Sequence, residues 1–186
     1  MSVTLHFNRS VVTKFVLSMT LPELNELPVN QLKEALSTCC GSTVWVNEMA
    51  RLFPIESRES LFEQSEMIWF ALDERDWREA FDHHPKIGDV NALREKFAST
   101  AAWVEGEQSG VSGASTSVLE MLAEGNELYE EKFGYIFIVC ATGKSAEDML
   151  EILEARLLNS PDEEIQIAMQ EQHKITKIRL EKLLIA

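Results

Sequence analysis

The feature that most constrains the fold of this 186-residue chain is helical spacing of apolar side chains, repeated in one segment after another. Residues three or four apart lie on one face of a helix, so each run predicts a helix with one buried face. Prolines interrupt the runs, and Pro54 and Pro85 are two clear stops. The pattern therefore predicts an all-α fold, a single compact domain of about seven to eight helices.

Local signals predict where several of these helices begin. Ser145 opens the sequence Ser-Ala-Glu-Asp and Ser160 opens Ser-Pro-Asp-Glu, and both resemble capping boxes, the second with proline at its favoured position. Ser57 precedes another apolar run, and Asn30 is the expected N-cap of the run that follows it. We expect the last helix to extend from Ser160 to Leu184.

Two segments of the second half have distinct patterns. One keeps a 3.6-residue period and predicts a helix, with its inner face formed by Val111, Ala114, Val118, Met121, Leu122 and Leu128. The other, YIFIVCA at residues 135–141, is apolar and rich in β-branched residues, and Gly134 and Gly143 flank it. Its pattern fits either a buried strand or a buried turn of helix.

Charge and cysteine content limit the partners. The formal net charge of −14 argues against nucleic acid and anionic membrane surfaces, although a small anionic ligand needs only one or two local cations. No apolar run reaches the roughly 18 residues of a membrane span. The three cysteines are an odd number, and Cys39 and Cys40 are adjacent, which fits neither a disulfide framework nor a zinc site. We therefore expect a reducing compartment, the cytoplasm.

The first 18 residues differ from the rest of the chain. They contain Arg9 and Lys14 but no acidic residue, and they lack the helical period. We expect residues 1–18 to be a loose leader or the product of an upstream start codon, and residues 19–186 to form the domain. The alternative is a short strand docked on that domain.

The first candidate for chemistry is the sequence FDHHPKIGDV, at residues 81–90. His84 precedes a proline, which disfavours helical backbone at this histidine, and it follows a helix that carries Trp77 and Phe81. A fixed imidazole beside an apolar wall suits a proton donor or acceptor that works near neutral pH. The alternative is a helix stop with solvated imidazoles.

The second candidate is the sequence WVEGEQSG, at residues 103–110. Glu107 and Gln108 lie between two glycines at the approach to a predicted helix. A helix N-terminus keeps a carboxylate ionised, and the adjacent amide offers both a donor and an acceptor. The alternative is an acidic first turn that only complements the helix dipole.

The third candidate is Arg179 in the last predicted helix. It lies at the centre of an inward-facing stripe formed by Ile165, Ala168, Gln172, Ile175 and Leu183. An arginine in such a stripe needs an anionic or carbonyl partner. The alternative is an ion pair with one of the chain's many acidic residues.

Taken together, the motifs DW.EAFDHHPKIGD, W...EQSG, LYEEKFGYIFIVCATGKS and HKITKIRLEKL, in this order and at these distances, are specific as a set. The chain resembles the 2-oxo-4-hydroxy-4-carboxy-5-ureidoimidazoline (OHCU) decarboxylases of urate degradation. The resemblance covers about residues 20–184 and leaves the first 18 unmatched. Each motif alone would be weak.

The resemblance implies an all-α homodimer that acts on a small molecule and uses neither a metal nor an organic cofactor. It assigns catalysis to His84, Glu107 and Arg179. It assigns substrate contacts to Pro85, Val104, Gln108, Phe137, Ile138, Val139, Cys140 and Ala141. Many members have a serine three residues before the catalytic glutamate, where this chain has Val104, so one hydrogen bond to substrate is in question.

The implied reaction is decarboxylation of OHCU to (S)-allantoin and CO2. The leaving carboxylate is attached next to a C=N bond, so the substrate itself can accept the electrons. This agrees with the lack of a cofactor motif in the sequence. Two alternatives stay open: a lyase or decarboxylase that acts on another ureido acid, and a helical protein-interaction module without catalysis.

Overall fold

The computed structural model describes residues 18–84 and 116–185. Within these ranges the backbone forms eight α-helices, and β pairing is limited to one isolated parallel bridge between Met19 and Leu184. The predicted all-α fold is confirmed. None of the described helices combines the length and the apolar character that crossing a membrane requires.

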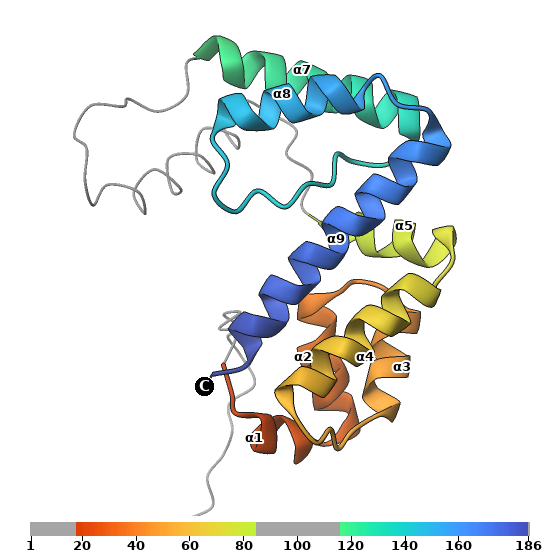
Figure 1. Cartoon of the computed structure of the whole chain (residues 1–186), viewed down its shortest axis with the longest axis vertical. Helices are drawn as coiled ribbons and strands as arrows, with labels where there is room; N and C mark the ends of the chain where they lie inside the picture. Colours follow the sequence, from red (N-terminus) through yellow and green to blue (C-terminus); the bar gives the residue numbers. More distant parts are fainter. Residues whose placement is uncertain (1–17, 85–115, 186) are drawn as a thin grey trace, which may run out of the picture.

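Two groups of helices are joined by one long helix (Figure 1). The helices α2, α3 and α4 pack together in one group, whereas α7 and α8 lie side by side in the other. Helix α9 contacts α2, α4 and α5 and continues toward the second group. The bounds are α1 Leu21–Asn25, α2 Val29–Cys39, α3 Thr43–Arg51, α4 Arg58–Ala71, α5 Glu74–Asp82, α7 Thr116–Phe133, α8 Ala146–Arg156 and α9 Pro161–Leu183.

Three tryptophans link α3, α4, α5 and α9 through hydrogen bonds to backbone carbonyls. The indole N–H of Trp45 in α3 donates to the Ser65 carbonyl in α4 at 3.1 Å. The indole of Trp69 in α4 donates to the Met169 carbonyl in α9 at 3.0 Å, and that of Trp77 in α5 donates to the Trp69 carbonyl at 3.2 Å. Each ring is buried, and each N–H has a partner, so burial of the large rings leaves no unpaired donor.

The predicted helix starts are confirmed at three serines and wrong at one asparagine. The side chains of Ser57, Ser145 and Ser160 each accept a backbone N–H in the first turn of α4, α8 and α9. Helix α2 instead begins at Val29, with Pro28 as its N-cap and no side-chain cap, so Asn30 lies inside the first turn. Proline needs no hydrogen bond for its nitrogen, so Pro28 can be the N-cap, and the helix begins two residues earlier than predicted.

The predicted inner face of the helix that became α7 is partly wrong. Met121 and Leu128 are 45% and 49% exposed. The buried face includes Gly125, where an added Cβ would lie 2.7 Å from Leu153 Cδ2 in α8. The buried face of α7 is the one on which Gly125 allows α8 to approach closely. Counting apolar residues in the sequence does not detect this approach, because glycine is not counted as an apolar side chain. Val111 and Ala114 lie outside the described residues.

The 135–141 segment is neither of the predicted forms. It links α7 to α8 as irregular backbone between Gly134 and Gly143, whose φ angles of 74° and 75° few other residues adopt. Arg156 Nη1 donates to the Ile138 carbonyl at 2.7 Å, and Lys144 Nζ donates to the Cys140 carbonyl at 2.7 Å. Side chains thus satisfy backbone groups that a sheet or a helix would otherwise pair.

Candidate active site

The two adjacent histidines face different parts of the molecule. His83 is the C-cap of α5, and its Nδ1 lies 3.0 Å from the Glu79 carbonyl. An added Cβ at Gly41 would lie 2.4 Å from the Cβ of His83, so the loop after α2 meets this histidine closely. His83 also lines a hollow of about 510 Å³ along α2 and α3.

His84, in contrast, faces α9. Its Nε2 lies 2.5 Å from Oε1 of Gln172, and its Nδ1 lies 3.5 Å from Nη2 of Arg179. These partners are 88 and 95 residues away in the sequence. Two of the three predicted catalytic residues, His84 and Arg179, are therefore neighbours in the folded chain.

Arg179 has a carbonyl partner, one of the two kinds that the sequence predicted. Its Nη1 donates to the Cys39 carbonyl at 3.4 Å, in the last turn of α2, where carbonyl groups lack helical partners. Among residues 18–84 and 116–185 no carboxylate forms an ion pair with Arg179. The guanidinium thus bridges the end of α2 and the imidazole of His84.

The 137–141 segment is hydrogen-bonded to α9 through Glu171, the residue that precedes Gln172. The backbone N–H of Cys140 donates to Oε2 of Glu171 at 2.7 Å, and Glu171 also forms an ion pair with Lys174. Burial alone would raise the pKa of Glu171, but the hydrogen bonds from Lys174 and the Cys140 N–H lower it below its ordinary value. Neighbouring residues of α9 therefore hold the segment and His84.

The thiols near Arg179 are protonated at neutral pH. Burial raises the pKa of Cys39 to about 11 and that of Cys40 to about 12, with the nearby Arg179 only partly opposing the shift. Neutral, buried thiols are poor nucleophiles. In the described part of the chain, no three His, Cys, Asp or Glu side chains gather as metal ligands. The groups available for chemistry here are the imidazole and the guanidinium.

Four predicted site residues lie outside the described residues: Pro85, Val104, Glu107 and Gln108. Their positions relative to His84 stay predictions, as does the helix start expected near residue 111. The described site therefore consists of His84 at the end of α5, Arg179 on α9, and the 137–141 segment.

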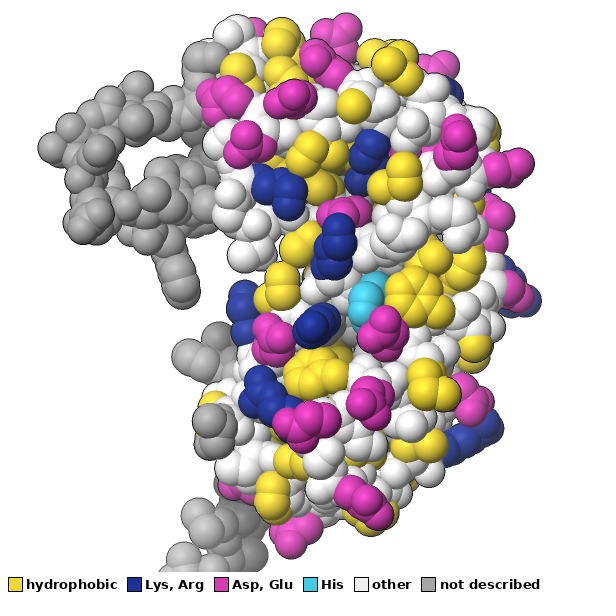
Figure 2. Space-filling model, in the orientation of Figure 1, with side chains coloured by type: hydrophobic (Ala, Val, Ile, Leu, Met, Phe, Trp, Pro, Cys, Tyr) yellow, Lys and Arg dark blue, Asp and Glu magenta, His cyan; other side chains and the backbone are white. Residues whose placement is uncertain are grey.

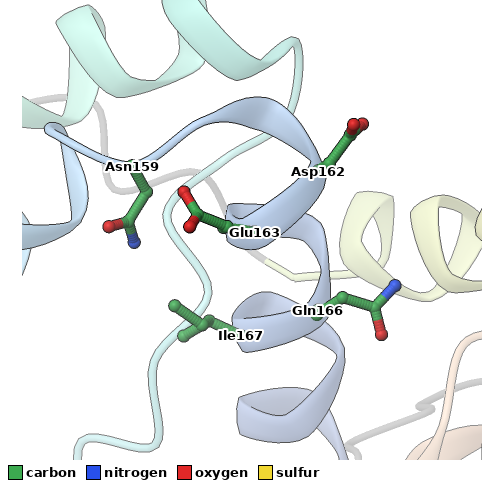
Figure 3. Close-up of a pocket in the computed structure, with 5 residues that line it drawn as sticks. All are labelled: Asn159, Asp162, Glu163, Gln166 and Ile167. Carbon is green, nitrogen blue, oxygen red and sulfur yellow. The ribbon is translucent and has the colours of Figure 1, made fainter.

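A second hollow, of about 490 Å³, lies away from these groups at the start of α9 (Figure 3). Its carboxylate Glu163 accepts hydrogen bonds from the Ser160 side chain and backbone, which lower its pKa and cap the helix. A capping role accounts for this residue. The lining consists of Asn159, Asp162, Glu163, Gln166 and Ile167.

Basic side chains lie along the middle of the face on which α9 runs, with acidic side chains between and around them (Figure 2). The chain as a whole carries a formal charge of −14, so these basic side chains stand singly or in small groups on an acidic protein. Such a distribution suits a small anion better than an extended polyanion, because an extended polyanion needs a broad basic face.

Sequence reasoning missed the residues that connect these groups. Gln172 was assigned only to the inner stripe of the last helix, yet it is 0% exposed and contacts His84. A polar amide in an apolar stripe carried the same signal as Arg179, because a buried amide also requires partners. Glu171 gave no such signal, because it is one of many glutamates.

The family model and the similar proteins all indicate the same family. The family model described as OHCU decarboxylase matches residues 25–181. The uric acid degradation bifunctional protein TTL of Arabidopsis thaliana is 39% identical over 148 residues, which are 78% of this chain. An OHCU decarboxylase of Haloferax volcanii is 24% identical, and the match covers 87% of this chain and 94% of that protein.

A solved structure gives the same answer for the fold. A crystal structure of OHCU decarboxylase in the presence of (S)-allantoin superposes with a TM-score of 0.66 at 37% identity. The match covers 81% of this chain and 96% of that one. The chain spans less than half the length of the bifunctional relatives, 45% of the Arabidopsis protein and 32% of one from Bacillus subtilis.

Proposed function

This chain belongs to the OHCU decarboxylase family, and we propose that it converts OHCU to (S)-allantoin and CO2 in the degradation of urate. The observation that carries the proposal is the meeting of His84 and Arg179, with Nδ1 and Nη2 3.5 Å apart. A general acid–base group beside a fixed cation, on an otherwise acidic protein, suits a small anionic substrate.

In the proposed reaction, the protein has to orient the substrate and transfer a proton. The carbon–carbon bond to the carboxylate breaks, its electron pair moves toward the neighbouring C=N bond of the substrate, and CO2 leaves. A proton is then delivered to one face of the ring. His84 and Glu107 are the groups that we propose for proton handling, and delivery to one face accounts for an S product.

Arg179 is proposed to bind a carbonyl oxygen of the substrate, not the leaving carboxylate. A guanidinium clamped on that carboxylate would stabilise the ground state and slow the loss of CO2. Its acceptor at the end of α2 is consistent with this role, because the Cys39 carbonyl is a neutral group. Gln108 and the backbone of residues 137–141 complete the proposed binding site.

One sequence feature favours a second candidate, decarboxylation of a different ureido acid. Val104 stands where many family members have serine, so one polar contact to OHCU is replaced by an apolar side chain. A substrate that lacks the corresponding polar group would suit this position better. His84 and Arg179 would keep the same roles.

We also propose that the enzyme is a cytoplasmic homodimer that needs no metal or organic cofactor. Three free, buried cysteines support a reducing compartment. The apolar side chains of Met67 and Phe70, 65% and 43% exposed on α4, are available for contact with a second copy.

The direct test supplies the freshly generated product of urate oxidation and follows circular dichroism as allantoin forms. The proposal expects a rapid signal of (S)-allantoin, unchanged by EDTA. Activity on another ureido acid with no acceleration on OHCU would favour the second candidate. Absence of both activities would overturn the enzymatic assignment.

A further inference from the structure

Gln172 is a buried amide that contacts His84 and Thr176. We propose that it is a positioning residue, which fixes both the orientation and the tautomer of the His84 imidazole. Its effect on turnover rests on the proposed function. The tautomer itself is a property of the protein without substrate, so it can be measured whether or not the reaction is correctly assigned.

Both ends of the Gln172 side chain are held. Oε1 lies 2.5 Å from His84 Nε2, and Nε2 donates to Thr176 Oγ1 at 3.2 Å, one turn along α9. Gln172 is 0% exposed and Thr176 is 1% exposed, so bulk water cannot replace either contact. A buried amide that loses a partner is left unsatisfied, which gives this arrangement a strong preference for one geometry.

Arg179 determines the direction of the hydrogen bonds. A guanidinium only donates, so His84 Nδ1, 3.5 Å from Arg179 Nη2, must present its lone pair. The proton of the neutral ring is then on Nε2 and is donated to Oε1 of Gln172. The amide in turn presents its NH2 group to the Thr176 hydroxyl. The donors all point the same way, from Arg179 through His84 and Gln172 to Thr176.

The reverse orientation of the amide is disfavoured. It would place the NH2 group of Gln172 against Nε2 of His84 and require the ring proton on Nδ1, where it would face the donor-only guanidinium. Gln172 and Arg179 therefore select the same tautomer from opposite sides of the ring.

The test combines nitrogen NMR with kinetics on the full-length protein. The ring nitrogens are followed through long-range proton–nitrogen correlations in protein labelled at histidine, with His84 assigned from the spectrum of His84→Asn. Gln172→Leu removes both ends of the amide, whereas Thr176→Val removes only the far acceptor. Thr176→Ser keeps the hydroxyl and is the matched control.

The wild type should show a single neutral tautomer with the proton on Nε2. Gln172→Leu should give a mixture of tautomers and lower kcat at least about tenfold with little change in KM, since acid–base help is worth about 10²–10⁴. Thr176→Val should shift the tautomer in the same direction, and Thr176→Ser should resemble the wild type. If Gln172→Leu does not fold, the Thr176 pair decides.

A wild-type proton on Nδ1 would overturn the inference. A folded Gln172→Leu protein that keeps the wild-type tautomer and kcat would also overturn it. If Gln172→Leu does not fold, the same result for Thr176→Val would overturn it. A wild type that is inactive on OHCU but has the Nε2–H tautomer, lost in Gln172→Leu, would sink the proposed function and support the role of Gln172. The two failures are therefore distinguishable.

Discussion

Gly41 is the residue at which the loop after α2 meets the end of α5. A Cβ added there would lie 2.4 Å from both Cβ and Cγ of His83, closer than non-bonded carbons approach. We expect Gly41→Ala to lower the free energy of unfolding by about 1–3 kcal/mol, as overpacking usually does. Urea denaturation measures the loss.

The control for Gly41 is the same change in a His83→Gly background, which removes both crowded atoms. There the added methyl group should cost much less. An equal loss of stability in the two backgrounds would mean that His83 is not the source of the crowding.

Arg179→Lys tests the role of the guanidinium. Nη1 and Nη2 contact two different acceptors, the Cys39 carbonyl and His84 Nδ1, and a lysine amine is a single point of charge that lacks this planar fork. We expect KM to rise about tenfold, equivalent to about 1.4 kcal/mol of lost binding, with a smaller effect on kcat. A fall in kcat at unchanged KM would assign Arg179 to the chemical step instead.

At the scale of single residues, the sequence predicts residues with distinctive chemistry better than it predicts the residues that hold them in place. His84 and Arg179 were identified as candidates because a proline and an apolar stripe made them unusual. Gln172 was present in the same stripe but was not predicted to contact His84, because no local pattern states which element faces a helix. That contact joins residues 88 apart.

At the scale of elements, a buried network holds the link between α7 and α8 to α9. Glu164 accepts hydrogen bonds from the Tyr129 hydroxyl and from Arg156 Nε, the latter at 2.7 Å, and Arg156 also binds the Ile138 carbonyl. Burial raises the pKa of Tyr129, so its hydroxyl stays protonated and donates. The network thereby fixes the segment that is proposed to bind substrate.

We expect Glu164→Gln to lower the free energy of unfolding by about 3–5 kcal/mol, because the buried Arg156 loses its counter-charge. The matched control is Glu181→Gln on the exposed side of α9, which should change stability by less than about 0.5 kcal/mol. Similar denaturation midpoints for the two variants would contradict the structural role of the ion pair.

The same elements show which local predictions succeed. Ser57, Ser145 and Ser160 each cap a helix through the residue three positions away, so a short sequence window contains the whole interaction. The 135–141 segment was ambiguous because Arg156 and Glu171, which satisfy its backbone, lie 18 and 31 residues from their partners. Long-range side-chain contacts decide its form.

At the scale of the whole molecule, the first and last described segments of the chain are paired through backbone hydrogen bonds. The Met19 N–H donates to the Leu183 carbonyl at 2.8 Å, and the Ile185 N–H donates to the Met19 carbonyl at 3.0 Å. Figure 1 shows α1 and the C-terminus at the same end of the molecule. These contacts predict where the chain can be shortened from its N-terminus.

A chain shortened to begin at Met19 should fold and keep the specific activity of the full chain, because it retains both backbone contacts. A chain that begins at Leu21 loses them together with the Thr20 cap, and should lose about 1 kcal/mol or more of stability. Thermal melting and the allantoin assay check both. A lower melting temperature with lost activity in the Met19 form would show that residues 1–18 belong to the domain.

Helical periodicity was enough to predict an all-α domain, and the motif set was enough to predict the family. Neither could predict that α9 would connect both groups of helices and carry Gln172 and Arg179 beside His84. Amphipathic spacing shows which face of a helix is buried but not what covers it.

The central claim is that His84, held against α9, handles the proton in the decarboxylation of OHCU. The most direct measurement compares single-turnover rates of His84→Asn and His83→Asn on freshly generated substrate, with folding checked by circular dichroism. We predict a loss of at least about a hundredfold for His84→Asn, the lower end of acid–base contributions, and a near wild-type rate for His83→Asn. A dead His83 variant, or near-full rates in both, would contradict the account.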